Sequence, residues 1–217
     1  MPYRLVLWDF DGTLADSMAI SLTIINRLAL QYRFKPITDP YSVRKMTVRK
    51  FMKEHKIGFL KLPRITKAFQ QALRQEIEKV PLYPGLIRVL KQTHAAGVRH
   101  AILSSNSPEN IQAFLLTHGI TEYFEFTAGC FKLLGKARGI KRVIKQHKIP
   151  KKEVLYVGDE VRDVAAAHKA GIDVAAVSWG INDWNTLAAE EPTHQVATPE
   201  ELLVVATSNK TPSNVKK

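Results

Sequence analysis

Short apolar runs alternate with amphipathic segments along most of this chain of 217 residues. The runs have the length of strands and are rich in Val, Leu, Ile and Ala, as expected for strands that are buried on both faces. The segments between them carry apolar residues at helical spacing. This alternation predicts an α/β fold with a parallel sheet covered by helices. Strands are expected at 5–9, 99–104, 124–128, 154–158 and 174–178, and helices at 85–96, 108–118, 136–147 and 161–170.

One long segment, 17–81, breaks this alternation because it contains helical patterns and no convincing strand. Ile24 and Leu28 fall on one helical face, and 65–77 carries a second apolar stripe. Prolines and a glycine at 81–85 mark the far boundary of the segment. The predicted units are a core of 1–16 and 82–207, an α-helical insert of 17–81, and a polar, disordered tail of 208–217.

The insert carries most of the positive charge of the chain. It holds 14 Lys or Arg against 4 Asp or Glu, a net +10 out of +12 for the whole chain. Such a field draws anions towards a nearby cleft, and it is also what a solvated, soluble face would carry. Nucleic-acid binding is disfavoured because no aromatic stacking platform or known binding motif accompanies the charge.

Cysteine usage and hydropathy indicate a cytoplasmic protein. The single cysteine, Cys130, excludes an intramolecular disulfide and fits a reducing compartment. No apolar run reaches membrane-spanning length, so no membrane partner is expected. The first residues lead straight into the strand before Asp9, and a cleaved signal peptide would remove that strand. These patterns carry no information on oligomeric state.

Polar residues follow three of the expected strands. Asp9 and Asp11 stand two apart after the first apolar run, Asp159 follows Gly158 after another, and 104–107 supplies hydroxyls and an amide after a third. Each tip by itself is consistent with a turn whose side chains cap backbone amides. Three such tips in a parallel sheet favour one shared pocket, because active sites of these sheets lie at the carboxyl ends of the strands. Paired carboxylates there can bind a divalent cation or act as nucleophile and general acid.

With these residues in view, the chain resembles the haloacid dehalogenase superfamily, and within it the phosphoglycolate-phosphatase-like hydrolases. The family's motifs occur in order as DFDGTLADS from Asp9, ILSSN from Ile102, a lysine at Lys136, and GDEVRD from Gly158. DFDGT together with GDxxxD is a highly specific combination, whereas a lone lysine is weak without the others. The resemblance implies a Rossmann-like parallel core with a helical cap inserted between the first two motifs.

The resemblance also implies chemical roles for the acidic residues. Asp9 would attack phosphorus and form an aspartyl phosphate, and Asp11 would act as general acid and then as general base. Mg²⁺ would be held by the carboxylates of Asp9 and Asp159 and by the backbone carbonyl of Asp11. Asp163 would support the site, either as a water-mediated ligand or by fixing Lys136. Gly12 and Thr13 belong to the first motif, and Gly12 would let the backbone approach the phosphate.

Phosphate binding is assigned in the same way. Ser105 and the backbone amide of Asn106 match the second motif, with Ser104 as the competing hydroxyl. Lys136 would bind the phosphate and neutralise charge on the nucleophile. Nearby lysines, Lys132 and Lys141, compete with Lys136, which is preferred because it opens a helix after Gly135.

The predicted function is therefore a Mg²⁺-dependent phosphatase that hydrolyses a small phosphorylated metabolite, either phosphoglycolate-like or a sugar phosphate. Asp11 disfavours a dehalogenase, which lacks that second carboxylate. A phosphomutase like β-phosphoglucomutase stays open, although Thr13 favours hydrolysis, as does a non-catalytic binding protein for anions or nucleic acid. Many related caps have a glycine near Met46, which puts phosphoglycolate itself in doubt. In the insert, Arg44, Lys45 and Arg49 are candidates to bind a second anionic group of the substrate.

Overall fold

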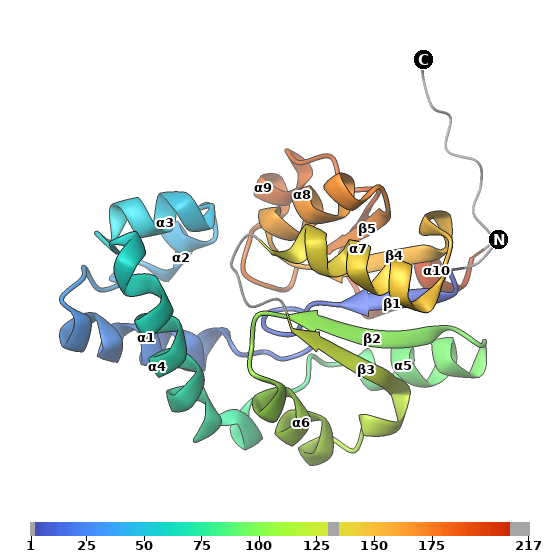
Figure 1. Ribbon diagram of the computed structural model, residues 1–217, viewed down its shortest axis with the longest axis horizontal. Coiled ribbons are helices and arrows are strands. Elements are labelled where there is room, and N and C mark those ends of the chain that lie inside the picture. The colour runs from blue at the N-terminus through green and yellow to red at the C-terminus, as the bar shows by residue number, and fades with distance from the viewer. Residues whose placement is uncertain (1–2, 130–134, 209–217) are drawn as a thin grey trace.

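A parallel sheet forms the centre of the protein (Figure 1). The structure, a computed structural model, describes residues 3–129 and 135–208. Within those ranges the sheet has six strands in the order β3-β2-β1-β4-β5-β6. The strands are β1 (Leu5–Trp8), β2 (Arg99–Ser104), β3 (Phe124–Gly129), β4 (Val154–Gly158), β5 (Asp173–Val177) and β6 (His194–Val196).

The first apolar run becomes an interior strand of this sheet. Leu5 of β1 pairs with Arg99 on one side and with Val154 on the other, both in parallel register. Because successive side chains of a strand point to opposite faces, Val6 and Trp8 enter one hydrophobic cluster and Leu5 and Leu7 the other. All four are buried. A strand buried on both faces explains the uninterrupted apolar sequence.

Helices cover both faces of the sheet (Figure 1). On the face of Trp8, Val89, Phe114 and Leu202 pack from three helices, and on the opposite face Ile140 packs from another. The first group is α5 (Leu86–Ala95), α6 (Pro108–Thr117) and α10 (Pro199–Thr207). The second group is α7 (Lys136–His147), α8 (Val161–Ala170) and α9 (Trp184–Ala188). The predicted α/β class with a parallel sheet is thus confirmed.

The inserted helices lie together beside the carboxyl ends of the strands, towards which the strand arrows point in Figure 1. The segment 18–79, here called the cap segment, contains α1 (Met18–Tyr32), α2 (Pro40–Val43), α3 (Val48–Glu54), α4 (Leu62–Arg74) and the short 3₁₀ helices η1 (Phe59–Lys61) and η2 (Ile77–Lys79). The predicted stripe on α1 buries Ile24 and Leu28, and α4 contributes Ile65 and Leu73 to the same cluster. The cap segment is therefore held together by its own apolar contacts.

Sequence patterns located most of the core elements and missed several short ones. The strands expected at 99–104 and 154–158 and the helices at 136–147 and 161–170 have the observed bounds. The third 3₁₀ helix, η3 (Thr121–Tyr123), and the fourth, η4 (Lys151–Glu153), are single turns that lead into β3 and β4. Strand β6 was missed because its three residues contain no apolar run. Cys130 and residues 209–217 of the predicted tail lie outside the described residues.

Candidate active site

Asp9 and Asp11 lie where β1 leaves the sheet. The amide of Asp9 donates to Val157 O at 2.8 Å, which keeps Asp9 in register with β4, and its side chain is 2% exposed. Asp11 lies in the following turn, where Ser17 Oγ and Asn106 Nδ2 donate to its two carboxylate oxygens at 3.0 and 2.9 Å. The turn therefore brings Asp11 against Asn106, two residues after the end of β2.

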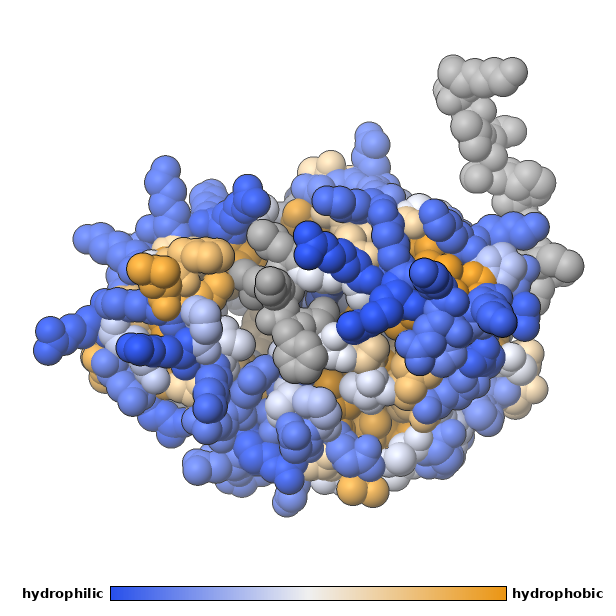
Figure 2. Space-filling view, viewed as in Figure 1, coloured by the Kyte–Doolittle hydropathy of each residue, from blue (hydrophilic) through white to orange (hydrophobic). Residues whose placement is uncertain are grey.

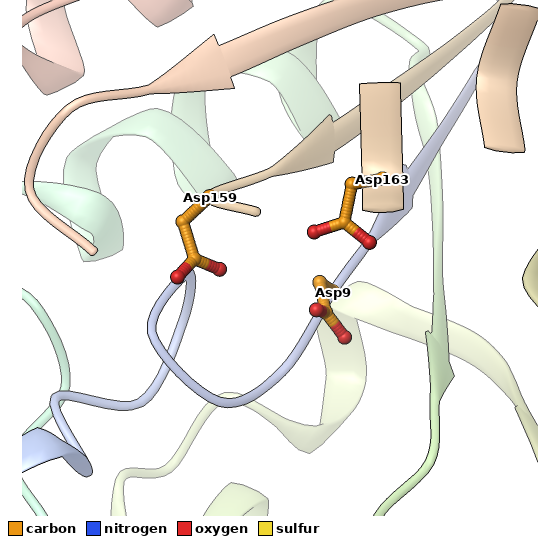
Figure 3. A group of neighbouring side chains, drawn as sticks. All are labelled: Asp9, Asp159 and Asp163. Atoms are coloured by element: carbon orange, nitrogen blue, oxygen red, sulfur yellow. The ribbon is translucent and has the colours of Figure 1, made fainter. Parts of the chain in front are cut away.

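Asp159 is held by the first motif and by a loop after β5. Thr13 Oγ1 donates to Asp159 Oδ1 at 2.6 Å, and the amide of Ile181 donates to Oδ2 at 2.7 Å. The carboxylates of Asp9, Asp159 and Asp163 gather at the strand ends, as Figure 3 shows, with one oxygen of each within 4.8 Å of the others. Two segments far apart in sequence, at Asp9 and at 159–163, thus meet in one buried acidic cluster.

Lys136 is the cation of this cluster. It begins α7 after Gly135 and is 3% exposed, and its Nζ contacts both Asp9 Oδ2 and Asp163 Oδ1. Burial alone would lower the pKa of Lys136, but the carboxylates of Asp163 and Asp9 raise it above its ordinary value, so the ammonium form is kept. The competing Lys141 is exposed. Lys132 lies outside the described residues.

Electrostatics of the acidic residues fit a bound cation. Burial, followed by the charges of Glu160, Asp9 and Asp163, raises the pKa of Asp159 well above its ordinary value. The site therefore holds more buried negative charge than its own cations neutralise, and a divalent ion with a preference for hard oxygen ligands would relieve that excess. Burial, with a smaller effect of Asp9, raises the pKa of Asp11 to about 6. A carboxyl with that pKa can be protonated or ionised near neutral pH, as a general acid and base requires.

Glycines make room for these carboxylates. Gly12 has a φ of 79°, and a Cβ there would lie 2.2 Å from Asp159 Oδ2. A Cβ at Gly158 would lie 2.6 Å from Asp163 Oδ2, and one at Gly180 would lie 2.2 Å from Asp159 Cβ. Gly12 thus leaves room for the Asp159 carboxylate, whereas the sequence analysis predicted that it lets the backbone approach the phosphate. Gly180 was missed because its only sequence signal is a glycine shortly after an apolar run.

Residues of the second motif lie beside Asp11. Ser105 is partly exposed, whereas Ser104 is 1% exposed and its Oγ accepts from the amide of Asn106 at 3.0 Å. Phosphate binding by that amide would require this hydrogen bond to open. The side chain of Asn106 is oriented by Asn110 Nδ2, which donates to its Oδ1 at 3.0 Å. Ser105 is thus the hydroxyl of the pair that solvent and ligand can reach.

Two side chains beside the candidate active site join the cap segment to the core by hydrogen bonds. Gln70 Nε2 donates to Ser105 O at 2.8 Å, so α4 contacts the second motif directly. Asn182, 1% exposed, donates to the carbonyls of Arg44 and Met46 at 2.9 and 3.2 Å. The sequence analysis missed Gln70 and Asn182, because a single amide side chain on a helix or loop has no periodicity that distinguishes it from a solvated one.

Of the basic residues predicted to bind a second anionic group, Arg44 reaches the core, whereas Lys45 and Arg49 face solvent. Lys45 and Arg49 are exposed, and the Arg44 guanidinium lies 3.5 Å from Ser178 O. On the face shown in Figure 2, hydrophilic side chains surround an apolar patch on this side of the molecule. No helix in the described parts of the chain is long and apolar enough to cross a membrane.

Comparison with known proteins agrees with this fold and site. The family described as haloacid dehalogenase-like hydrolase matches residues 6–177. The phosphoglycolate phosphatase of Synechococcus elongatus is 32% identical over 204 residues, which cover 93% of this chain and 96% of that protein. A phosphoglycolate phosphatase of Pseudomonas fluorescens is 31% identical over 205 residues, which cover 88% of this chain and 75% of that protein.

Solved structures with the same fold include a predicted phosphatase from Clostridium acetobutylicum, with a TM-score of 0.82 and 18% identity over 94% of this chain and 97% of that one. A haloacid dehalogenase-like hydrolase from Streptococcus pneumoniae has a TM-score of 0.76 and 19% identity, covering 93% of this chain and 97% of that one. At these identities the structural likeness shows the fold alone.

The sequence matches extend over most of the chain and define its class, a phosphoric monoester hydrolase, as the sequence analysis predicted. The chain belongs to the haloacid dehalogenase-like hydrolase family. Within that family it is similar to the phosphoglycolate phosphatases.

Proposed function

We propose that this protein is a Mg²⁺-dependent phosphatase that hydrolyses a small phosphate monoester through an aspartyl phosphate on Asp9. The observation that carries the proposal is the buried contact of Asp9 with Lys136, next to Asp159 and within the same strand-end turn as Asp11. The contact with the ammonium fixes the position of the Asp9 carboxylate at the strand end, where it can act as a nucleophile. The name of the relative from Synechococcus elongatus supports a small phosphorylated metabolite as substrate.

Each step of the reaction has a residue to perform it. Asp9 attacks phosphorus, and Asp11 donates a proton to the leaving alkoxide oxygen as the P–O bond breaks. Asp11 then takes a proton from the water that hydrolyses the aspartyl phosphate. Lys136 stabilises negative charge on Asp9 and on the transferring phosphoryl group. Ser105 and Asn106 orient the phosphate oxygens.

The acidic cluster is also suited to Mg²⁺. Asp9 and Asp159, with the backbone carbonyl of Asp11, would hold the ion, which supplies charge neutralisation to the phosphate oxygens when bound. Asp163 accepts from the amide of Glu160 at 3.1 Å and contacts Lys136, so it orients the lysine. The predicted insert of 17–81, which contains the cap segment, would close over the phosphate and exclude water from the first step.

Phosphate release from a panel of small esters, with and without Mg²⁺, tests this proposal. Asp9→Asn should lower release by about 1000-fold or more, since it removes the nucleophile. The matched control is Asp39→Asn, because Asp39 is exposed and caps α2, where asparagine caps equally well. Mass spectrometry of the quenched wild type should find one phosphoryl group on Asp9. Release that persists in a folded Asp9→Asn variant, or no release on any ester by the folded wild type, would overturn the proposal.

A further inference from the structure

A cavity of about 280 Å³ lies between the core and the cap segment and opens onto the candidate active site. At its core end it is lined by Asp11, Ser17 and Ser105. Any phosphate placed against Asp11 and Ser105 would direct the rest of its ester into this cavity. The lining beyond the phosphate position therefore bears on which leaving group the enzyme prefers.

The wall that the cap segment contributes is apolar except for Ser21. Helix α1 supplies Met18, Leu22 and Ile25, α2 supplies Val43, and α3 supplies Phe51. Leu22 and Val43 are partly exposed and do not belong to the packed hydrophobic clusters among the described residues. Side chains that line a cavity without packing in a core leave apolar surface available to a ligand.

Charged groups on the lining do not favour a second anion. Within the described part of the chain these are Asp11, Glu160 and Arg162. Arg162 Nε donates to Glu160 Oε1 at 2.9 Å, and Nη2 contacts the same oxygen, so its charge is already paired. Of the three basic residues predicted to bind a second anionic group, Lys45 and Arg49 are exposed, and Arg44 is partly buried and donates to Ser178 O at 3.5 Å. None of the three lines this cavity. A carboxylate in the cavity would lose its hydration and, among the described lining residues, meet no cation other than the paired Arg162.

We infer that the preferred substrate is a phosphate monoester with an apolar leaving group, alkyl or aryl, rather than one with a second carboxylate such as phosphoglycolate. The inference rests on the proposed phosphatase function and names its substrate class. The volume of the cavity is sufficient for such a leaving group, because a dry cavity of about 150 Å³ lined by similar side chains is large enough to bind benzene. Hydrolysis would release the alcohol and inorganic phosphate, with the P–O bond broken as in any monoester.

Matched alkyl phosphates test the preference, since their alcohols differ little as leaving groups. Ethyl, propyl, butyl and pentyl phosphate should show kcat/KM rising about fourfold per methylene until the cavity is filled. At equal chain length, 4-carboxybutyl phosphate should be a poorer substrate than pentyl phosphate, and 2-phosphoglycolate should be a poorer substrate than ethyl phosphate. Chain-length independence, or a preference for the carboxylated esters, would overturn the inference while leaving the phosphatase function intact.

Two leucines of the same helix provide a variant and its control. Leu22→Ala should lower the ratio of kcat/KM for pentyl phosphate over ethyl phosphate by about three- to tenfold, because it removes apolar contact area from the cavity wall. Leu30→Ala should keep the wild-type ratio, since Leu30 is 80% exposed and does not line the cavity. Equal ratios in the wild type and both variants would contradict the assignment of this wall to the substrate.

Binding without turnover separates the two proposals. Ethyl, butyl and pentyl phosphonate carry a C–P bond that a phosphatase does not cleave, and calorimetry gives their Kd in the presence of Mg²⁺. The Kd should fall about fourfold per methylene whether or not any ester is hydrolysed. If the Kd falls in this way but no ester is hydrolysed, the proposed phosphatase function is refuted and the apolar binding site stands. If the Kd does not change with chain length, the inferred apolar leaving group is refuted.

Discussion

His100 should make the stability of this protein depend on pH. Its side chain on β2 is fully buried, and Trp8 Nε1 donates to its Nδ1 at 3.0 Å. Nε2 lies 2.9 Å from Thr93 Oγ1, whose own hydrogen is directed to Val89 O at 2.6 Å. The ring is therefore neutral, with its proton on Nε2. A second proton, on Nδ1, would point at the hydrogen of Trp8 Nε1 and break that hydrogen bond.

The size of the effect follows from the pKa of His100. Burial, with a smaller contribution from His94 and against the attraction of Glu125, lowers that pKa from 6.5 to about 4. Because the folded pKa is the lower one, protons bind preferentially to the unfolded chain as the pH falls below 6.5. His100 should thus cost about 2 kcal/mol of unfolding free energy between pH 7 and pH 5, and about 3 kcal/mol once the pH is below 4.

Urea denaturation at pH 7 and pH 5 measures this contribution. His100→Gln does not titrate and can still accept from Trp8 and donate to Thr93, so its unfolding free energy should fall about 2 kcal/mol less than that of the wild type. His168→Gln removes an exposed histidine and should follow the wild type. Equal losses in the wild type and His100→Gln, within about 0.5 kcal/mol, would refute the reasoning. NMR should also find the His100 ring neutral at pH 5.

Two further substitutions test the supports of the site. Gly180→Ala should lower kcat/KM about tenfold or more and raise the Mg²⁺ concentration needed for half-maximal activity, because the new Cβ would displace Asp159. Gly58→Ala is the control and should have no effect, since a Cβ there meets nothing within 4 Å. An unchanged Mg²⁺ dependence in Gly180→Ala would show that Gly180 is not needed to position Asp159. Asn182→Ala should lower the unfolding free energy by about 1–3 kcal/mol and speed proteolysis of the cap segment, since it removes two hydrogen bonds to that segment. If proteolysis of the cap segment is as slow in Asn182→Ala as in the wild type, Asn182 does not hold that segment to the core.

Local sequence patterns were enough to locate the sheet and the acidic strand ends. The apolar runs before Asp9 and Asp159 predict strands buried on both faces, and polar residues directly after such strands must lie at one edge of a parallel sheet. Lys136 was chosen because it opens a helix at the position where the third motif of the resembled family falls, and the structure brings it against Asp9. These features depend on spacing along the chain, which the sequence contains in full. The catalytic roles assigned to these residues stay predictions.

Only the tertiary structure decided which side chains meet across the cleft. Gly180 makes room for Asp159, and Glu160 neutralises Arg162, through contacts that no periodicity encodes. The cap segment was predicted from helical patterns without a strand, and its charge suggested that it draws anions, yet its lysines face solvent and its apolar residues line the cavity. Composition records how many charges a segment has, whereas the packing of α1 to α4 determines the direction in which each side chain points. The substrate preference depends on that direction, because burial and pairing set the energy of a ligand group in the cleft.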